Sequence, residues 1–216
     1  WFVKLPDGLD WENQPAHVGV AVDALATPYK VLKRARIKPG ETVAVFGAGG
    51  GLGIHQLMLA KWANARVIAV DTKANKFDTC KEVGADEVVD ASKENVVEAL
   101  MDLTGGKGVD HVMEVGGAGT MKQTLRAIRP GGTVSLVGVL AGARSDLLIP
   151  LIGSRNIRLQ GVTVGTTEGL STMLRAMALH RTKAVVDRVF PMAEAREAYE
   201  HLMAGRHFGK VCIAIP

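Results

Sequence analysis

The sequence predicts an α/β protein built on a doubly wound parallel sheet. Short apolar runs alternate with amphipathic helical patterns along most of the chain, and parallel strands need such helices as right-handed crossovers. In addition, residues 42–71 follow the order strand, glycine turn, helix, strand and acid. That is the order of a dinucleotide-binding βαβ unit.

The glycine turn at residues 47–53 predicts a site for the pyrophosphate of a dinucleotide. Gly47, Gly50 and Gly53 give the spacing GxxGxxG rather than a strict GxGxxG. Glycines let backbone amides approach a phosphate, and the following helix presents free N–H groups and the positive end of its dipole. The residues expected to contact the cofactor are Gly47, Gly49, Gly50, Gly51, Leu52 and Gly53.

Two other interpretations of this turn remain open. A tight turn that binds nothing is possible, but five glycines in seven residues would then be an excessive entropic cost. A methyltransferase is the second, since GAGGG also contains GxGxG. Such proteins usually place an acid just before the first glycine, where this chain has Val45 and Phe46.

Asp71 ends the second strand of the unit, 18 residues after Gly53, and predicts a preference for NAD. Its carboxylate can accept hydrogen bonds from ribose hydroxyls and would repel a 2′-phosphate. Lys76 follows one helical turn later. It is either a second contact to the adenosine ribose or a solvated lysine.

The other elements follow from periodicity and from glycine and proline signals. Before the unit, residues 23–35 have a helical pattern in which Pro28 either kinks the helix or marks its first turn. After it, we expect helices at 73–83, 94–103 and 120–128, and strands at 87–89, 110–115, 133–139 and 157–164. The tail should form a helix at 169–180, a strand at 185–190, a helix at 192–203 and a strand at 211–215, packed outside the sheet.

Ligands of doubly wound sheets lie beyond the carboxyl ends of the strands. This rule adds the ends of the fourth and fifth strands to the candidate cofactor site, where small residues would leave room for a cofactor. The added residues are Val115, Val137, Gly138 and Val139.

Composition excludes several classes of protein. The 216 residues are 47% hydrophobic and 22% charged, with a net charge of +4. The basic residues are scattered along the sequence without interleaved aromatics, so we expect no nucleic-acid partner. No run is long enough to span a membrane, and no signal peptide is recognisable. Cys80 and Cys212 lack CxxC spacing, which predicts free thiols in a reducing, cytoplasmic compartment.

The histidines do not explain how a proton would be transferred. The six form no metal-binding spacing, and His55 is expected to be a surface or a satisfied core residue. The chain also begins at Trp1 without an initiator methionine. We therefore expect a processed or truncated chain that lacks part of its active site.

Ordered segments along nearly the whole chain resemble the medium-chain dehydrogenase/reductase superfamily, in its zinc-dependent alcohol dehydrogenase branch. They include KPGETVAVFGAGGGLG, KEVGADEVVD, VDHVMEVGG, IRPGGTVSLVGV and AYEHLMAGRHFGKV. The resemblance implies a Rossmann domain at 25–164, a remnant of a GroES-like catalytic domain at 1–24, and a return to that domain at 165–216. It also implies that the N-terminal catalytic half is absent.

The same resemblance assigns further residues. Asp23, four residues before Thr27 and six before Tyr29, matches the third protein ligand of the catalytic zinc. The alternative is an N-cap aspartate that opens a helix. Thr27 would lie near the nicotinamide, and Asp71 and Lys76 would hold the adenosine ribose. The segment Val162, Thr163 and Val164 would line the cofactor together with Val115 and Val139.

The implied function is NAD- and zinc-dependent oxidation of an alcohol to an aldehyde or ketone, with this chain as the cofactor-binding portion of a dimer or tetramer. The glycine turn, however, has the form common in zinc-free quinone reductases. A zinc-free quinone or enone reductase is thus an alternative, and a non-catalytic NAD-binding module is another. Alone, the chain should bind NAD without turning over an alcohol.

Overall fold

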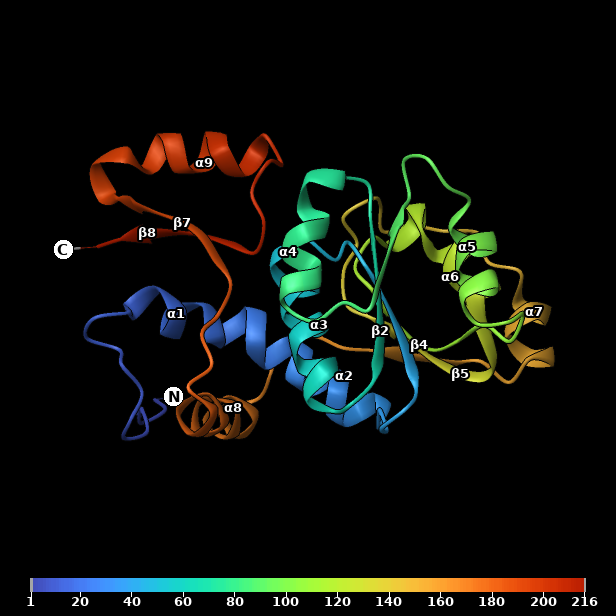
Figure 1. The fold of residues 1–216 in the computed structure, drawn as a ribbon, viewed down its shortest axis with the longest axis horizontal. Coiled ribbons are helices and arrows are strands. Elements are labelled where there is room, and N and C mark those ends of the chain that lie inside the picture. The colour runs from blue at the N-terminus through green and yellow to red at the C-terminus, as the bar shows by residue number, and fades with distance from the viewer. Residues whose placement is uncertain (1, 216) are drawn as a thin grey trace.

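The computed structural model describes residues 2–215. Its largest feature is a parallel sheet of six strands in the order β3-β2-β1-β4-β5-β6, with helices on both faces (Figure 1). The doubly wound sheet expected from the sequence is confirmed. Its strands are β1 (Thr42–Phe46), β2 (Arg66–Asp71), β3 (Glu87–Asp90), β4 (Val109–Glu114), β5 (Ile128–Leu136) and β6 (Arg158–Gly161).

Two apolar cores lie on the two faces of this sheet. On one face, Leu100 of α5 and Leu125 of α6 pack against β1, β4 and β5. On the other face, Ile54 and Leu57 of α3 pack against β1 and β2 together with Cys80 of α4. The helices are α1 (Pro15–Val20), α2 (Ala26–Ala35), α3 (Gly51–Trp62), α4 (Phe77–Glu82), α5 (Val96–Leu103), α6 (Met121–Ala127), α7 (Ile149–Ser154), α8 (Thr167–His180) and α9 (Ala195–Met203).

The tail forms a separate layer beside the sheet. Strands β7 (Val186–Pro191) and β8 (Lys210–Ala214) pair in parallel, and α9 connects them (Figure 1). A third core joins α8 to α3 and to the π-helical segment η1 (Ala21–Leu25). Met173 and Met177 of α8 are fully buried in this core, as their helical spacing predicts.

Several boundaries differ from the expected ones for local reasons. Strand β5 ends at Leu136 rather than Val139, because the amides of Val137 and Gly138 both turn to the Glu114 carbonyl. The helix expected at 73–83 is divided into a 3-10 turn (Ala74–Lys76) and α4. Strand β6 is only four residues long, and α7 was not expected.

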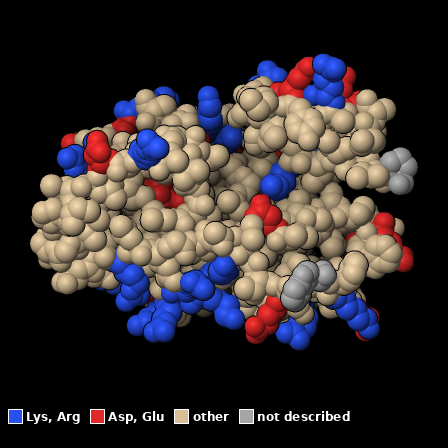
Figure 2. Space-filling model, turned by 180° about the vertical axis from the view of Figure 1, so that it is seen from behind, with Lys and Arg blue, Asp and Glu red and all other residues tan. Residues whose placement is uncertain are grey.

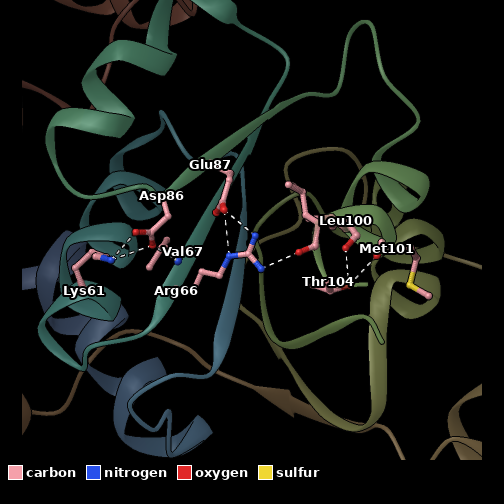
Figure 3. Close-up of polar contacts among 9 residues, drawn as sticks. Lys61, Arg66, Val67, Asp86, Glu87, Leu100, Met101 and Thr104 are labelled. Atoms are coloured by element: carbon pink, nitrogen blue, oxygen red, sulfur yellow. Dashed lines mark hydrogen bonds and ion pairs between the residues drawn. The ribbon is translucent and has the colours of Figure 1, made fainter. Parts of the chain in front are cut away.

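Polar contacts fix β3 beside β2 at the amino end of these strands (Figure 3). The Asp86 carboxylate accepts hydrogen bonds from Lys61 Nζ at 2.9 Å and from the Val67 amide at 2.7 Å. Arg66 donates to Glu87 at 2.7 Å and to the Leu103 carbonyl at 2.7 Å. These contacts set the register that places Asp71 at the opposite end of β2.

None of the helices between residues 2 and 215 combines the length and the apolar character needed to cross a bilayer.

Candidate functional site

The glycine turn lies where the strand order reverses, between β1 and β4. Gly47 has a φ of 69°, and a Cβ atom there would come within 2.9 Å of Val115 Cγ2, at the end of β4. A Cβ atom on Gly53 would clash with the Gly47 carbonyl oxygen and lie 2.8 Å from Ala48 Cα. Glycine is therefore required at both positions for the turn to close tightly over the start of α3.

The first amides of α3 are free to bind an anion. The Gly50 amide donates to Gly47, and the Gly50 carbonyl accepts from Ile54. Within residues 2–215, no acceptor is found for the amides of Gly51, Leu52 and Gly53. Three unsatisfied N–H groups at a helix N-terminus are a suitable site for a pyrophosphate.

Asp71 is held against this turn. One carboxylate oxygen accepts the Gly49 amide at 2.9 Å, and the other accepts the Lys73 amide at 3.1 Å. Each oxygen keeps a lone pair for a further donor, such as a ribose hydroxyl. Lys76 is 93% buried and lies over Gly49, where a Cβ atom would clash with the Lys76 stem.

The loops after β4 and β5 pack against each other next to the turn. A Cβ atom on Gly138 would clash with the Val115 backbone, and one on Gly117 would lie 2.9 Å from Val139 Cα. Gly138, which we expected to leave room for a cofactor, therefore also allows the two loops to touch, as does Gly117. Val115 is buried and Val139 is exposed.

Glu114 shapes the first of these loops, and its role was not anticipated. Its fully buried carboxylate accepts the amides of Gly116 at 2.8 Å and Gly117 at 3.0 Å. It also accepts the hydroxyls of Thr120 and Thr124, each at 2.5 Å. Four donors around one carboxylate hold the loop beside Gly47 in a single conformation.

The segment after β6 meets the start of α2. The Val162 amide donates to the Leu136 carbonyl at 2.9 Å, which ties this segment to β5. Lys30 Nζ of α2 donates to the Val164 carbonyl at 3.0 Å. Val162 is buried, whereas Thr163 and Val164 are exposed.

Asp23 and Thr27 lie together at this end of α2. The buried Thr27 hydroxyl donates to the Asp23 carboxylate at 3.1 Å, and Asp23 itself is exposed. Asp23 lies inside η1 and caps neither η1 nor α2. Asp23 is therefore not the N-cap that the alternative interpretation expected. The second oxygen of its carboxylate has no hydrogen-bond donor among the described residues.

The described chain does not by itself form a complete metal site. A catalytic zinc needs three protein ligands. Within residues 2–215, no three His, Cys, Asp or Glu side chains gather closely enough to hold a metal ion.

Comparison with known proteins agrees with this geometry. Residues 51–179 match the model of the family described as zinc-binding dehydrogenase. The chain belongs to this zinc-binding dehydrogenase family. An alcohol dehydrogenase from Geobacillus stearothermophilus is 30% identical over 100% of the chain and 61% of its own length.

Solved structures show the same fold. An NAD-dependent alcohol dehydrogenase superposes with a TM-score of 0.87 at 29% identity, over 98% of this chain and 61% of its own. A 2-octenoyl-CoA carboxylase reductase, solved with NADP and 2-octenoyl-CoA, superposes with a TM-score of 0.86 at 25% identity. The match covers 98% of this chain and 51% of that reductase chain. The zinc-binding dehydrogenase chain thus spans about half to three-fifths of the length of these proteins.

In this zinc-binding dehydrogenase chain, the tail also reaches the glycine turn. The Gly209 amide donates to the Gly49 carbonyl at 3.1 Å. A Cβ atom on Gly51 would meet the Lys210 stem, so this lysine lies against the start of α3. Contacts between residues so far apart in sequence have no local signal, and only the fold reveals them.

His55 is a satisfied core residue that links α3 to the tail, one of the two roles expected for it. The fully buried ring donates from Nδ1 to the Gly51 carbonyl at 2.5 Å. Nε2 accepts the Val185 amide at 2.8 Å, so the ring is neutral. Burial lowers the pKa of His55 from 6.5 to about 4, against the opposing effect of the Gly51 carbonyl.

We expect the stability of the chain to fall in mild acid because of His55. In the unfolded chain His55 is protonated below about pH 6.5, whereas in the folded chain it is protonated only below about pH 4. The free energy of unfolding should therefore drop by about 2 kcal/mol between about pH 7.5 and pH 5. Urea unfolding across this range should show a smaller drop in His55→Gln than in the wild type. His180→Gln, on the exposed end of α8, is the control; parallel curves for all three proteins would contradict the prediction.

Proposed function

We propose that this chain is the NAD-binding portion of an oxidoreductase that transfers a hydride between an alcohol and the nicotinamide. The main support is the position of Asp71, whose carboxylate is fixed beside the glycine turn with lone pairs to spare. A carboxylate there favours two ribose hydroxyls over a 2′-phosphate. The NAD-dependent alcohol dehydrogenase with the same fold supports the same choice.

The residues of this chain would bind and orient the cofactor. The free amides of Gly51, Leu52 and Gly53 would hold the pyrophosphate, and Asp71 and Lys76 would hold the adenosine ribose. The nicotinamide would extend over Val115 and the loops after β5 and β6. When bound, NAD supplies the hydride acceptor, and the buried side chains of Val115 and Val162 would limit the access of water to that part of the site.

For zinc, this chain would contribute one ligand. The free oxygen of Asp23 is suited to that role, and the Thr27 hydroxyl orients the carboxylate. The remaining ligands would have to come from outside residues 2–215. The alcohol, aldehyde or ketone that reacts is therefore part of the proposal for the whole enzyme rather than for this chain alone.

Replacing Asp71 should reverse the preference between the two dinucleotides. Asp71→Ser removes the ribose acceptor and the charge that repels a 2′-phosphate, so the Kd for NAD should rise at least about tenfold. The Kd for NADP should fall in the same variant. Calorimetric titration of both cofactors measures the two changes.

Two further variants make this test specific. Asp71→Asn keeps an acceptor without the charge and should lie between the wild type and Asp71→Ser. Asp146→Asn, on an exposed loop, controls for net charge and should bind like the wild type. If the unaltered chain bound NADP more tightly than NAD, the proposed role of Asp71 would be wrong.

An enone reductase of the same superfamily is the second candidate. The GxxGxxG turn favours it, as does the similarity to a reductase solved with NADP and an enoyl-CoA. Zinc analysis of the whole enzyme with and without Asp23→Ala separates the candidates, because only the alcohol dehydrogenase should lose zinc in the variant. A non-catalytic NAD-binding module would bind NAD and show neither alcohol dehydrogenase nor enone reductase activity.

A further inference from the structure

A cavity lies at the edge of the sheet opposite to the glycine turn. It has a volume of about 240 Å³ and is formed where α2 ends and where β1, β4, β5 and β6 begin. Nothing in the proposed NAD site involves this edge. Its charged lining residues are Arg36, Lys38, Arg129 and Arg158, which are basic, and Glu41 and Asp110, which are acidic.

Both acidic side chains already have partners. The Asp110 carboxylate accepts the Thr42 amide at 2.8 Å and Arg129 Nε at 2.5 Å. The Glu41 carboxylate accepts the Lys38 amide at 2.8 Å and lies 2.7 Å from His111 Nε2. These acids therefore hold the wall of the cavity together, and at most one of the four basic groups is neutralised by them.

Three basic groups are left without an acceptor. Within residues 2–215, the guanidinium groups of Arg36 and Arg158 and the ammonium group of Lys38 form no hydrogen bond or ion pair. All three side chains are exposed at the rim of the cavity. Figure 2 shows Lys and Arg side chains gathered along the lower edge of the molecule, the edge at which α2 ends in Figure 1.

The sheet register aligns three of the lining residues. His111 of β4 pairs with Thr133 of β5, and Thr133 pairs with Arg158 of β6. Neighbours in register point to the same face of a parallel sheet, which here is the face that α2 covers. Thr133, a buried residue whose hydroxyl forms no hydrogen bond with the described residues, thus lies between His111 and Arg158 in the sheet.

Arg36 takes an uncommon backbone conformation at the rim of the cavity. Arg36 ends α2 in the left-handed conformation, with φ 55° and ψ 44°. Glycine or asparagine normally takes this place, as Asn64 does after α3, because a long side chain is strained there.

We propose that this cavity binds a small phosphate-class anion, either inorganic phosphate or a phosphate monoester. Two guanidinium groups, one ammonium group and one hydroxyl offer more donors than the two oxygens of a carboxylate can use. A phosphate group presents at least three acceptor oxygens and matches the planar fork of arginine. The site is separate from the glycine turn and does not depend on the proposed function.

The test is a phosphate titration of the full chain, with potassium chloride at equal ionic strength as the blank. Thermal unfolding reports binding, because a ligand of the folded state raises the unfolding midpoint by an amount that grows with the logarithm of one plus the ratio of ligand concentration to Kd. Amide chemical shifts locate the anion. A parallel titration with glycerol 3-phosphate distinguishes a monoester from free phosphate.

Two arginines in the same strained conformation provide a matched pair of variants. Arg181 ends α8 with φ 50° and lines a different cavity with His17 and Met177. Arg36→Gly and Arg181→Gly remove the same charge and the same strain, so both should raise the unfolding midpoint in phosphate-free buffer. Only Arg36→Gly and Arg158→Gln should raise the Kd for phosphate, by about tenfold or more.

In the wild type, saturable shifts at Thr133 and Arg158 are the expected result. Shifts confined to Gly51, Leu52 and Gly53 would instead place the anion on α3 and overturn the proposal. Equal phosphate affinity in the wild type and Arg36→Gly would overturn it too, as would a response to chloride equal to that of phosphate.

Discussion

Gly53→Ala should destabilise the chain by about 3 kcal/mol and weaken NAD binding by about 100-fold. The new Cβ atom would clash with the Gly47 carbonyl oxygen and lie 2.8 Å from Ala48 Cα. Both are backbone atoms, so the turn must open, and overpacking of this kind costs about 1–3 kcal/mol or more. Opening would also displace the amides that we propose hold the pyrophosphate, and two lost charge-assisted hydrogen bonds amount to about 100-fold in affinity.

Two other glycines make the comparison specific. A Cβ atom on Gly153 of α7 would meet nothing within 4 Å, so Gly153→Ala should leave stability unchanged or raise it. A Cβ atom on Gly51 would meet the flexible stem of Lys210 and lie 3.3 Å from the Gly209 carbonyl oxygen, so Gly51→Ala should cost less stability than Gly53→Ala. Urea unfolding and NAD titration of the three variants check this order. A Gly53→Ala chain as stable as Gly153→Ala would contradict the prediction.

The sequence was sufficient for the parts of the fold that follow from local patterns. The βαβ unit at 42–71 and the alternation after it predict the sheet, because each element is specified by its own periodicity. The position of the glycine turn at the end of β1 follows from the same rule. Asp71 could be predicted to lie near that turn, since parallel strands end at one edge.

Features that depend on distant residues could not be predicted in this way. The sequence shows basic residues scattered along the chain, yet the register of β4, β5 and β6 brings Arg158 to the cavity where Arg36 ends α2. The early end of β5 depends on the Glu114 carbonyl, from a strand that precedes it by many residues. His55 bonds to Val185, and no spacing rule connects the two.

Glu114 is the clearest example of such a feature. The sequence predicts a cofactor site at the end of the fourth strand, but not that the Glu114 carboxylate holds the loop there. Glu114→Ala should destabilise the chain by about 3–5 kcal/mol. The change leaves the amides of Gly116 and Gly117 and two threonine hydroxyls without their acceptor, and each unpaired buried donor costs about 1–3 kcal/mol before water compensates part of it. The measurement is the free energy of unfolding in urea.

Glu114→Gln separates loss of the charge from loss of the acceptors. Its amide oxygen can keep the two backbone amides and Thr120, while its NH₂ group faces Thr124, whose hydroxyl can rotate to accept. We therefore expect Glu114→Gln to cost only about 1–2 kcal/mol. An equal loss in the Gln and Ala variants would show that the charge itself holds the loop. If the loop orders the cofactor site as we propose, NAD affinity should fall in the same order as stability, since this loop contacts the glycine turn through Val115 and the loop after β5 through Gly117.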